Sequence, residues 1–342
     1  MIRIAHLKFL SGLPVMNPFS QLIVPALFLL LWFTPTSVHA TDDLVGDWSL
    51  QLDSNTPAWM SIKKLGDKPE VTLRLHVGPD GPHKDIKMVD DRLTFTLRQN
   101  KKATDVKTVD VGIKNGRLEG VITSTTKNGK IHRDLFTGKK IPPVPSTPPD
   151  LSKVRFGHPI SLFNGRDLTG WQAHEPDKIM GWSVQDGLLV NNTPKTDFSA
   201  TGAYANLRTE AVFEDFWLHI EFNIDEARNS GVYLRGMYEA QVVDRDSRMQ
   251  GLQGVGSIFG QIAPSKKVGR KGGEWQTYDL TLVDRHVTVV LNGEKVIDNQ
   301  PVAGPTGGAV FTDPTAPGPI HLQGDHTSVK YRDIYLAPVI ED

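Results

Sequence analysis

Asn-Gly pairs at 115–116, 128–129 and 292–293 constrain this chain most, because each lies between short stretches of alternating apolar residues. Asn-Gly is the strongest short-range hairpin signal, since both central positions of a type I′ turn need a positive φ. No stretch of helical length repeats its apolar residues with a period of 3.6. The sequence therefore predicts an all-β protein built from antiparallel hairpins.

A proline-rich segment divides these strands into two groups. Five prolines fall between positions 142 and 149, and such a run is extended and cannot join the interior of a sheet. We take 141–154 as a linker. The short strands of 43–140 predict a small antiparallel barrel or half-barrel, with Trp48 placed to plug one end. The many strands and long excursions of 155–340 favour a concanavalin-like two-sheet jelly roll.

The first 40 residues have the features of an export signal. Arg3 and Lys8 precede an apolar run from Leu22 to Phe33, and Val38-His-Ala40 resembles a small-x-small cleavage site. That run is too short to span a bilayer, which takes ~20 residues. We therefore expect a signal peptide over 1–40 and an exported protein, in the periplasm or outside the cell, with no other membrane attachment.

Composition excludes several classes of function. The 342 residues leave room for two domains, and 38 basic against 39 acidic residues give no reason to expect a nucleic-acid partner. The absence of cysteine excludes disulfides, thiolate nucleophiles and zinc–thiolate sites. The sequence leaves the oligomeric state open.

The stretch 229–244 combines polar side chains on one face of two predicted strands. Alternation along Gly231–Arg235 and Tyr238–Val243, joined by a bend at Gly236 and Met237, separates an apolar face from a polar one. The polar face carries Tyr233, Arg235, Glu239 and Gln241. A solvent-facing ladder would show the same pattern. These residue types are also typical of a sugar-binding site, which uses planar hydrogen-bonding groups and a ring for stacking.

Other strands add candidates by the same alternation. His219 and Glu221 lie opposite the apolar set of 217–224, and His321 and Gln323 lie opposite that of 320–323. His326 follows in the next turn as a candidate acid or metal ligand. Asp244 could complete an oxygen-rich metal site with Glu239, or simply end a strand.

An ordered series of motifs through the second domain resembles the 3-keto-disaccharide hydrolase family. It includes Leu162-Phe-Asn-Gly-Arg-Asp-Leu-Thr-Gly-Trp171, Asn229-Ser-Gly-Val-Tyr-Leu-Arg235, Tyr238-Glu-Ala-Gln-Val-Val-Asp244 and Gly318-Pro-Ile-His-Leu-Gln-Gly-Asp-His326. The resemblance covers about 155–340 and implies a concanavalin-like jelly roll and an exported enzyme acting on glycosides oxidised at C3. Thr327 and Phe259 depart from the Gly and Tyr common in the family, which bears on the substrate more than on the fold.

Cleavage of such a 3-keto-glycoside requires a base for the C2 proton, an electrophile for the oxyanion and an acid for the leaving group. We expect Glu239 as base or metal ligand, His326 as acid, and Arg235 as an oxyanion or hydroxyl ligand. Hydration after elimination would complete a net hydrolysis. The expected substrate-binding residues are Tyr233, Gln241, His219, Glu221, His321 and Gln323. These residues identify no cofactor, and a divalent cation such as Ca²⁺ at Glu239 and Asp244 is compatible with this set.

Two other functions fit parts of the pattern. A retaining β-glucanase of the laminarinase type uses Glu-x-Asp-x-x-Glu, where this chain has Glu239-Ala-Gln-Val-Val-Asp244. Plain strand separates those outer Cα atoms by roughly 16 Å, whereas a retaining pair of carboxyls lies about 5–5.5 Å apart. A non-catalytic, lectin-like glycan-binding module is the second alternative, since the fold serves binding as readily as cleavage.

Overall fold

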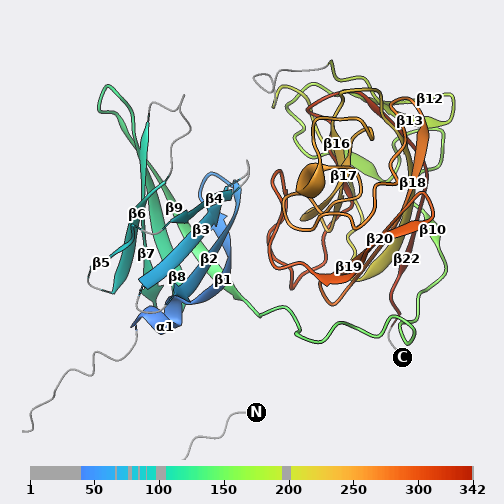
Figure 1. The fold of residues 1–342 in the computed structure, drawn as a ribbon. Coiled ribbons are helices and arrows are strands. Elements are labelled where there is room, and N and C mark those ends of the chain that lie inside the picture. Colours follow the sequence, from blue (N-terminus) through green and yellow to red (C-terminus); the bar gives the residue numbers. More distant parts are fainter. Residues whose placement is uncertain are drawn as a thin grey trace, which may run out of the picture. The chain divides into compact units, whose positions relative to one another are not determined.

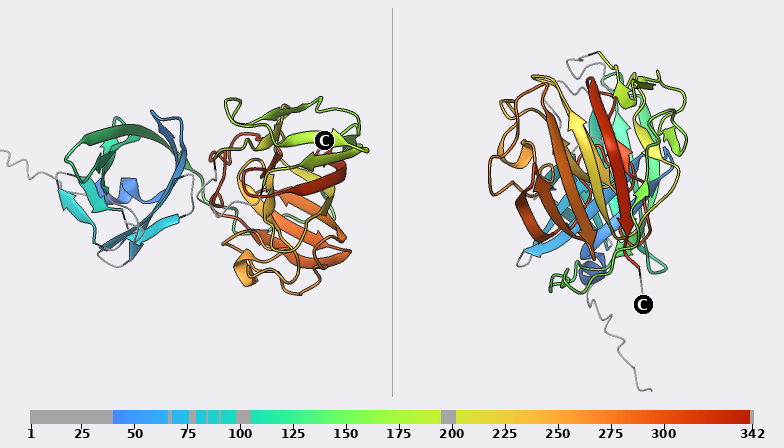
Figure 2. Two further views of the ribbon diagram at one scale, coloured as in Figure 1. Left: turned by 90° about the horizontal axis from the view of Figure 1, so that it is seen from above. Right: turned by 90° about the vertical axis from the view of Figure 1, so that its right-hand side faces the viewer.

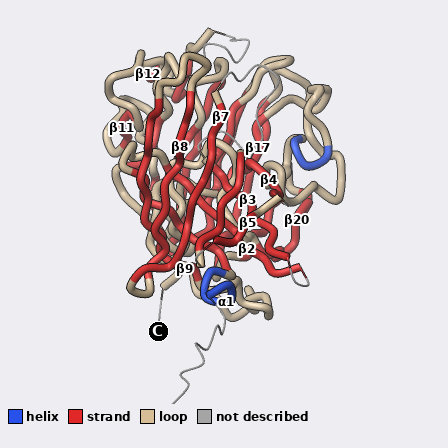
Figure 3. Tube along the Cα trace, turned by 90° about the vertical axis from the view of Figure 1, so that its left-hand side faces the viewer, coloured by secondary structure: helices blue, strands red, loops and turns tan. Residues whose placement is uncertain are grey.

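The computed structural model describes residues 40–65, 68–75, 79–83, 85–89, 91–97, 105–194 and 202–340. The predicted signal peptide lies outside these residues except for Ala40, the first residue of helix α1 (Ala40–Leu44). None of the helices described is long and apolar enough to cross a membrane. The all-β prediction is confirmed, since strands make up nearly all of the regular structure (Figure 3).

The first part of the chain forms a nine-stranded antiparallel sheet in the order β4-β3-β2-β1-β9-β8-β7-β6-β5. Its strands are β1 (Gly46–Leu52), β2 (Pro57–Leu65), β3 (Lys68–Arg74), β4 (Pro79–His83), β5 (Lys87–Val89), β6 (Arg92–Thr96), β7 (Val106–Lys114), β8 (Arg117–Thr125) and β9 (Ile131–Ile141). Figure 2 (left) shows this sheet curled into an open ring, as the half-barrel prediction required. Trp48 is buried in its core and donates a hydrogen bond from Nε1 to the Leu44 carbonyl of α1.

The second part of the chain, after the proline-rich segment, contains two sheets (Figure 1). The larger sheet runs β12-β13-β22-β15-β18-β19-β20, with β10 paired to β22. Its strands are β10 (Ile160–Ser161), β12 (Trp182–Gln185), β13 (Leu188–Asn191), β15 (Phe216–Asn223), β18 (Trp275–Val283), β19 (His286–Leu291), β20 (Glu294–Pro301) and β22 (Val329–Pro338).

The smaller sheet has the order β11-β14-β21-β16-β17. Its strands are β11 (Trp171–Ala173), β14 (Leu207–Thr209), β21 (His321–Leu322), β16 (Ser230–Leu234) and β17 (Tyr238–Val242), and a 3-10 turn η1 (Gly251–Gln253) follows β17. One apolar cluster contains Leu218, Ile220 and Phe222 of β15 together with Val232 of β16 and Ala240 of β17. The two sheets therefore pack face to face as a sandwich, and the jelly-roll prediction is confirmed.

Candidate functional site

Polar residues form a row across the small sheet on the face opposite the apolar core. Consecutive strand pairs bring Gln172 opposite Arg208, Arg208 opposite His321, His321 opposite Tyr233, and Tyr233 opposite Glu239. Their strand neighbours Trp171, Leu207, Leu322, Val232 and Ala240 all belong to the core. Because side chains alternate along a strand, the whole row must lie on the other face. We call these five residues the polar row.

A second set of polar side chains lies two residues further along the same strands. Alternation places Gln241, Gln323, Asn206 and His174 on the face of the polar row, and Gly231 is the member of this set on β16. Gln323 donates its backbone N–H to the Gly231 carbonyl, and His174 donates its own to Asn206. Sequence alternation thus grouped Tyr233, Glu239, Gln241, His321 and Gln323 correctly.

Burial increases along the polar row toward Glu239. Gln172 and Arg208 are half-buried, whereas His321, Tyr233 and Glu239 are almost fully buried. Two segments flank edge strand β17 here: Thr306 Oγ1 accepts the Glu239 backbone N–H, and the backbone N–H of Phe259 donates to the Glu239 carbonyl. The burial of these three side chains shows that the polar face is covered here, so the interpretation as a solvent-facing ladder is wrong.

Glu239 is held over a glycine. A Cβ atom on Gly231 would lie 2.4 Å from Glu239 Oε1, so only glycine at that position leaves room for the carboxyl group. Burial raises the pKa of Glu239 to about 8, a hydrogen bond with Tyr233 opposes this, and the charge of Asp325 adds to it. Near neutral pH the carboxyl group is thus mostly protonated.

Tyr233 has one proton and two possible acceptors. Its hydroxyl donates to the carbonyl of Gly307 at 2.9 Å, and Glu239 is its other hydrogen-bond partner. A proton given to Gly307 is not available to the Glu239 carboxylate, which weakens the one effect that lowers the pKa of Glu239. Burial also raises the pKa of Tyr233 well above its ordinary value, with the Glu239 charge as a further cause, so Tyr233 stays neutral.

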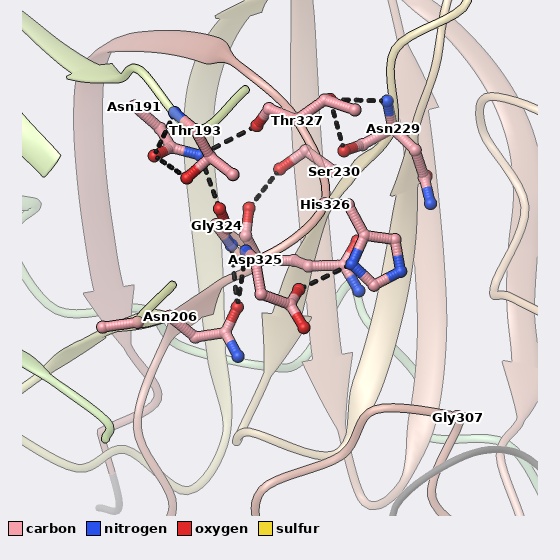
Figure 4. A network of polar contacts seen from close by, with 12 residues as sticks. Asn191, Thr193, Asn206, Asn229, Ser230, Gly307, Gly324, Asp325, His326 and Thr327 are labelled. Atoms are coloured by element: carbon pink, nitrogen blue, oxygen red, sulfur yellow. Dashed lines mark hydrogen bonds and ion pairs between the residues drawn. The ribbon is translucent and has the colours of Figure 1, made fainter. Parts of the chain in front are cut away.

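His326 is oriented by the carboxylate next to it in the chain. His326 Nδ1 lies 2.6 Å from Asp325 Oδ1, and both side chains are largely buried. When Nδ1 carries the proton and donates it to the carboxylate, Nε2 is the nitrogen able to take up a proton. The turn is fixed by Asn206 Oδ1, which accepts the backbone N–H groups of Gly324 and Asp325 (Figure 4).

Arg235 is not part of the polar row, which corrects its predicted role. The strand ends at Leu234, and Arg235 and Gly236 both have positive φ (55° and 64°) as the centre of a turn closed by Met237 N–H to the Leu234 carbonyl. Its Nη2 donates to the carbonyls of Pro314 and Ala316 at 3.0 and 2.8 Å. Arg235 therefore holds a loop in place, and Arg208 is the arginine of the row.

His219 and Glu221 also lie elsewhere. They belong to β15 of the larger sheet, and the core residues Leu218, Ile220 and Phe222 alternate with them. His219 is paired with Asp279 at 2.8 Å and Glu221 with Arg332 at 2.7 Å, on the outer face of that sheet. Because the core separates this face from the polar row, neither residue can share a substrate with Glu239.

The structure gives the predicted metal site no support. Both carboxylate oxygens of Asp244 accept backbone N–H groups, one from Ala227 and one from Asp246, at 2.9 Å each. Within the part of the chain described, no group of three or more His, Cys, Asp or Glu residues is arranged to hold a metal ion. Asp244 shapes a loop, so its pairing with Glu239 as a retaining glycosidase also lacks support.

Sequence reasoning missed Gln172, Arg208, His174 and Asn206. They come from β11, β14 and the residues beside them, and each of these two strands has only three residues. An alternating pattern is not recognisable over so short a length. The Nε atom of Arg208 is shielded from solvent and has no hydrogen-bond partner among the described groups. This is the one signal that could have marked Arg208, and it is visible only in the folded protein.

Comparison with known proteins finds one family model that spans this site. A family model described as the 3-keto-alpha-glucoside-1,2-lyase-like domain matches residues 158–337, which include both polar sets and His326. No curated protein matches the chain.

Similar solved structures include two proteins of Parabacteroides distasonis described as candidate glycosyl hydrolases. One is 22% identical, with 52% of this chain and 92% of the other covered at a TM-score of 0.44. The second is 23% identical, with 53% and 98% covered at 0.40. A non-specific endo-β-1,3(4)-glucanase of glycoside hydrolase family 16 is 11% identical, with 57% and 93% covered at 0.32.

Proposed function

Because this chain belongs to the 3-keto-alpha-glucoside-1,2-lyase-like family, we propose that it cleaves 3-keto-glycosides, 3-keto-disaccharides among them, by elimination followed by hydration. The observation that carries the proposal is a protonated, buried Glu239 near an Asp325–His326 pair. The raised pKa suits Glu239 to act as an acid, and the Asp325 carboxylate beside Nδ1 of His326 leaves Nε2 as the candidate base, the two roles that elimination requires.

The first step removes the proton at C2. A ketone at C3 makes that hydrogen acidic, and His326 Nε2, with Asp325 on its other nitrogen, is the group suited to accept it. The electron pair moves into the C2–C3 bond and gives an enolate oxygen at C3. His321 on β21 and Gln323 just after it are buried polar residues. They support binding of the sugar oxygens.

The second step breaks the C1–O bond. The enolate electrons form the C1=C2 double bond, the leaving oxygen departs, and neutral Glu239 supplies the proton it needs. Water then adds across C1=C2, with its oxygen on C1 and a proton on C2, which makes the net change a hydrolysis. The sequence had suggested Glu239 as base and His326 as acid. The burial of Glu239 favours the reverse assignment.

Proton exchange separates the two steps and tests the roles. In D₂O, the wild-type protein should cleave a 3-keto-disaccharide and leave the unoxidised sugar intact. Glu239→Gln should still exchange the C2 proton, visible by NMR, while release of the leaving sugar falls by about 10²-fold or more. His326→Ala should lose both, and the exposed Glu210→Gln serves as control.

Three outcomes would count against this proposal. Exchange lost in Glu239→Gln and kept in His326→Ala would restore the opposite assignment of acid and base. Cleavage of the unoxidised sugar would indicate a conventional glycosidase. Sugar binding without any turnover would indicate a glycan-binding module. Addition of a chelator tests the predicted divalent cation in the same assay.

We further propose that the protein is exported. The basic start, the short apolar run and the cleavage-like Val38-His-Ala40 support this. Expression of the full chain in a Gram-negative host, followed by N-terminal sequencing of the periplasmic product, should return Thr41 as the first residue. An unprocessed product retained in the cytoplasm would contradict export.

A further inference from the structure

A pocket of about 310 Å³ opens beside His326, away from the core of the sandwich. Its wall includes Arg228, Asn229, Ser247, Met249 and His326. The volume is at the lower end of the about 300–1,000 Å³ usual for small-molecule sites, so it suits one sugar ring better than a chain of several. None of the lining residues is Phe, Trp or Tyr.

The charges around the pocket are mixed. Arg228 and Arg248 stand against Glu226, Asp244 and Asp246 in the lining. Asp244 is occupied by backbone N–H groups, and Asp246 is paired with Arg245. Such a lining offers both donors and acceptors without a dominant sign, which fits a neutral ligand with several hydroxyl groups better than an ion.

One acceptor in the wall has no partner of its own. The Oδ1 atom of Asn229 is shielded from solvent and has no hydrogen-bond partner among the described groups, which is a costly state for a buried polar atom unless a ligand satisfies it. The backbone of Asn229 is fixed independently, because its N–H and carbonyl both bond to the Thr327 hydroxyl. Figure 4 shows Asn229 and His326 on the same side of the 324–327 turn.

We propose that this pocket binds the leaving group and selects a hydroxyl-rich sugar over an aromatic alcohol, with Asn229 accepting a hydrogen bond from one of its hydroxyls. The assignment as a leaving-group subsite rests on the proposed function. His326 connects the two sites. Its ring lines the pocket, and it is hydrogen-bonded to Asp325, whose charge contributes to the raised pKa of Glu239. A sugar in the pocket therefore lies next to His326, the proposed base.

A pair of substrates with the same keto sugar tests the selection. One carries glucose as leaving group, and the other carries 4-nitrophenol. Asn229→Ala should raise KM for the disaccharide about five- to tenfold, the value of one lost hydrogen bond, and change KM for the aryl glycoside less than twofold. Asn229→Asp keeps an acceptor oxygen and should restore most of the loss. The exposed Asn192→Ala is the matched control.

Binding of free glucose, followed by ligand-observed NMR, gives a readout that does not depend on turnover. Loss of this binding in Asn229→Ala but not in Asn192→Ala would support the subsite, even if the protein cleaved neither substrate. The absence of cleavage would contradict only the proposed function. If Asn229→Ala changed KM equally for both substrates, or for neither, the subsite would be overturned although the proposed cleavage remained valid. The absence of both glucose binding and cleavage in the wild-type protein would also overturn it.

Discussion

At the scale of single residues, the proposed reaction depends on keeping one carboxyl group neutral. Glu239 has almost no exposed surface and no cation beside it in the polar row, and the neighbouring Tyr233 has the Gly307 carbonyl as a second acceptor for its one proton. The carboxyl group is thereby prepared to donate at a pH where an ordinary glutamate could not.

This protonation predicts a pH dependence of stability. The pKa of Glu239 rises from 4.5 to about 8 on folding, so between these values the unfolded chain has released a proton that the folded protein keeps. The free energy of unfolding should fall as pH rises through this window, by an amount on the order of a few kcal/mol, and level off above it. Urea titrations of wild type and Glu239→Gln measure this directly.

The variant has no proton to lose at this position, so its stability should depend less on pH between 5 and 8. Activity of the wild type should likewise decline above about pH 8, where the acid loses its proton. Parallel pH profiles of stability for the two proteins would show that Glu239 ionises normally in the fold.

Gly231 provides a second test at this scale. An added methyl group would contact Glu239 Oε1 at 2.4 Å and Cγ at 2.8 Å, which forces the carboxyl group out of place. We expect Gly231→Ala to lower kcat at least tenfold while the protein still folds, since displacement of a reacting group is costly. Gly157→Ala, with its nearest contact at 3.3 Å, is the control, and full activity of Gly231→Ala would refute this role for the glycine.

At the scale of elements, alternation within a hairpin was predictable and membership of a sheet was not. Tyr233, Glu239 and Gln241 share a face because the period of two is a local property of β16 and β17. His219 shows the same alternation, yet its strand pairs with β18 and β22 in the other sheet. Long-range strand pairing decides which sheet a strand joins, and the residue pattern of a single strand contains no information about that pairing.

Arg235 shows a second limit at this scale. The polar pattern continues through it, but the strand stops one residue earlier because the turn takes Arg235 and Gly236 with positive φ. Only the closed turn reveals that its guanidinium points to the carbonyls of Pro314 and Ala316.

The corrected role of Arg235 gives a prediction for the β16–β17 turn. Arg235→Ala should reduce the free energy of unfolding by roughly 2–4 kcal/mol, because it removes two buried, charge-assisted hydrogen bonds. The folded fraction should keep its exchange of the C2 proton, measured at low temperature where the variant remains folded. If Arg235→Ala lost exchange of the C2 proton while its stability was unchanged, Arg235 would have to be assigned a catalytic role.

At the scale of the whole molecule, the described residues form two separate apolar clusters. One comprises residues of the nine-stranded sheet, such as Trp48, Leu73 and Phe136, and the other comprises those of the sandwich. A domain with a hydrophobic core of its own can in principle fold alone. The polar row, the Asp325–His326 pair and the pocket beside it all come from the sandwich.

A fragment of residues 142–342 should therefore fold alone and retain glucose binding and turnover within about threefold of the full chain. Circular dichroism and a cooperative thermal transition would establish folding, and the assays above would establish function. A folded fragment without turnover would show that the nine-stranded sheet contributes to the reaction.

The order of strands in the small sheet also has a consequence for biosynthesis. Across the sheet the polar row reads 172, 208, 321, 233, 239, so its central histidine is the last of the five to leave the ribosome. Until β21 takes its place between β14 and β16, the halves of the row belong to unconnected strands. A nascent chain that lacks β21 therefore cannot assemble the polar row, although four of its five residues have already been synthesised.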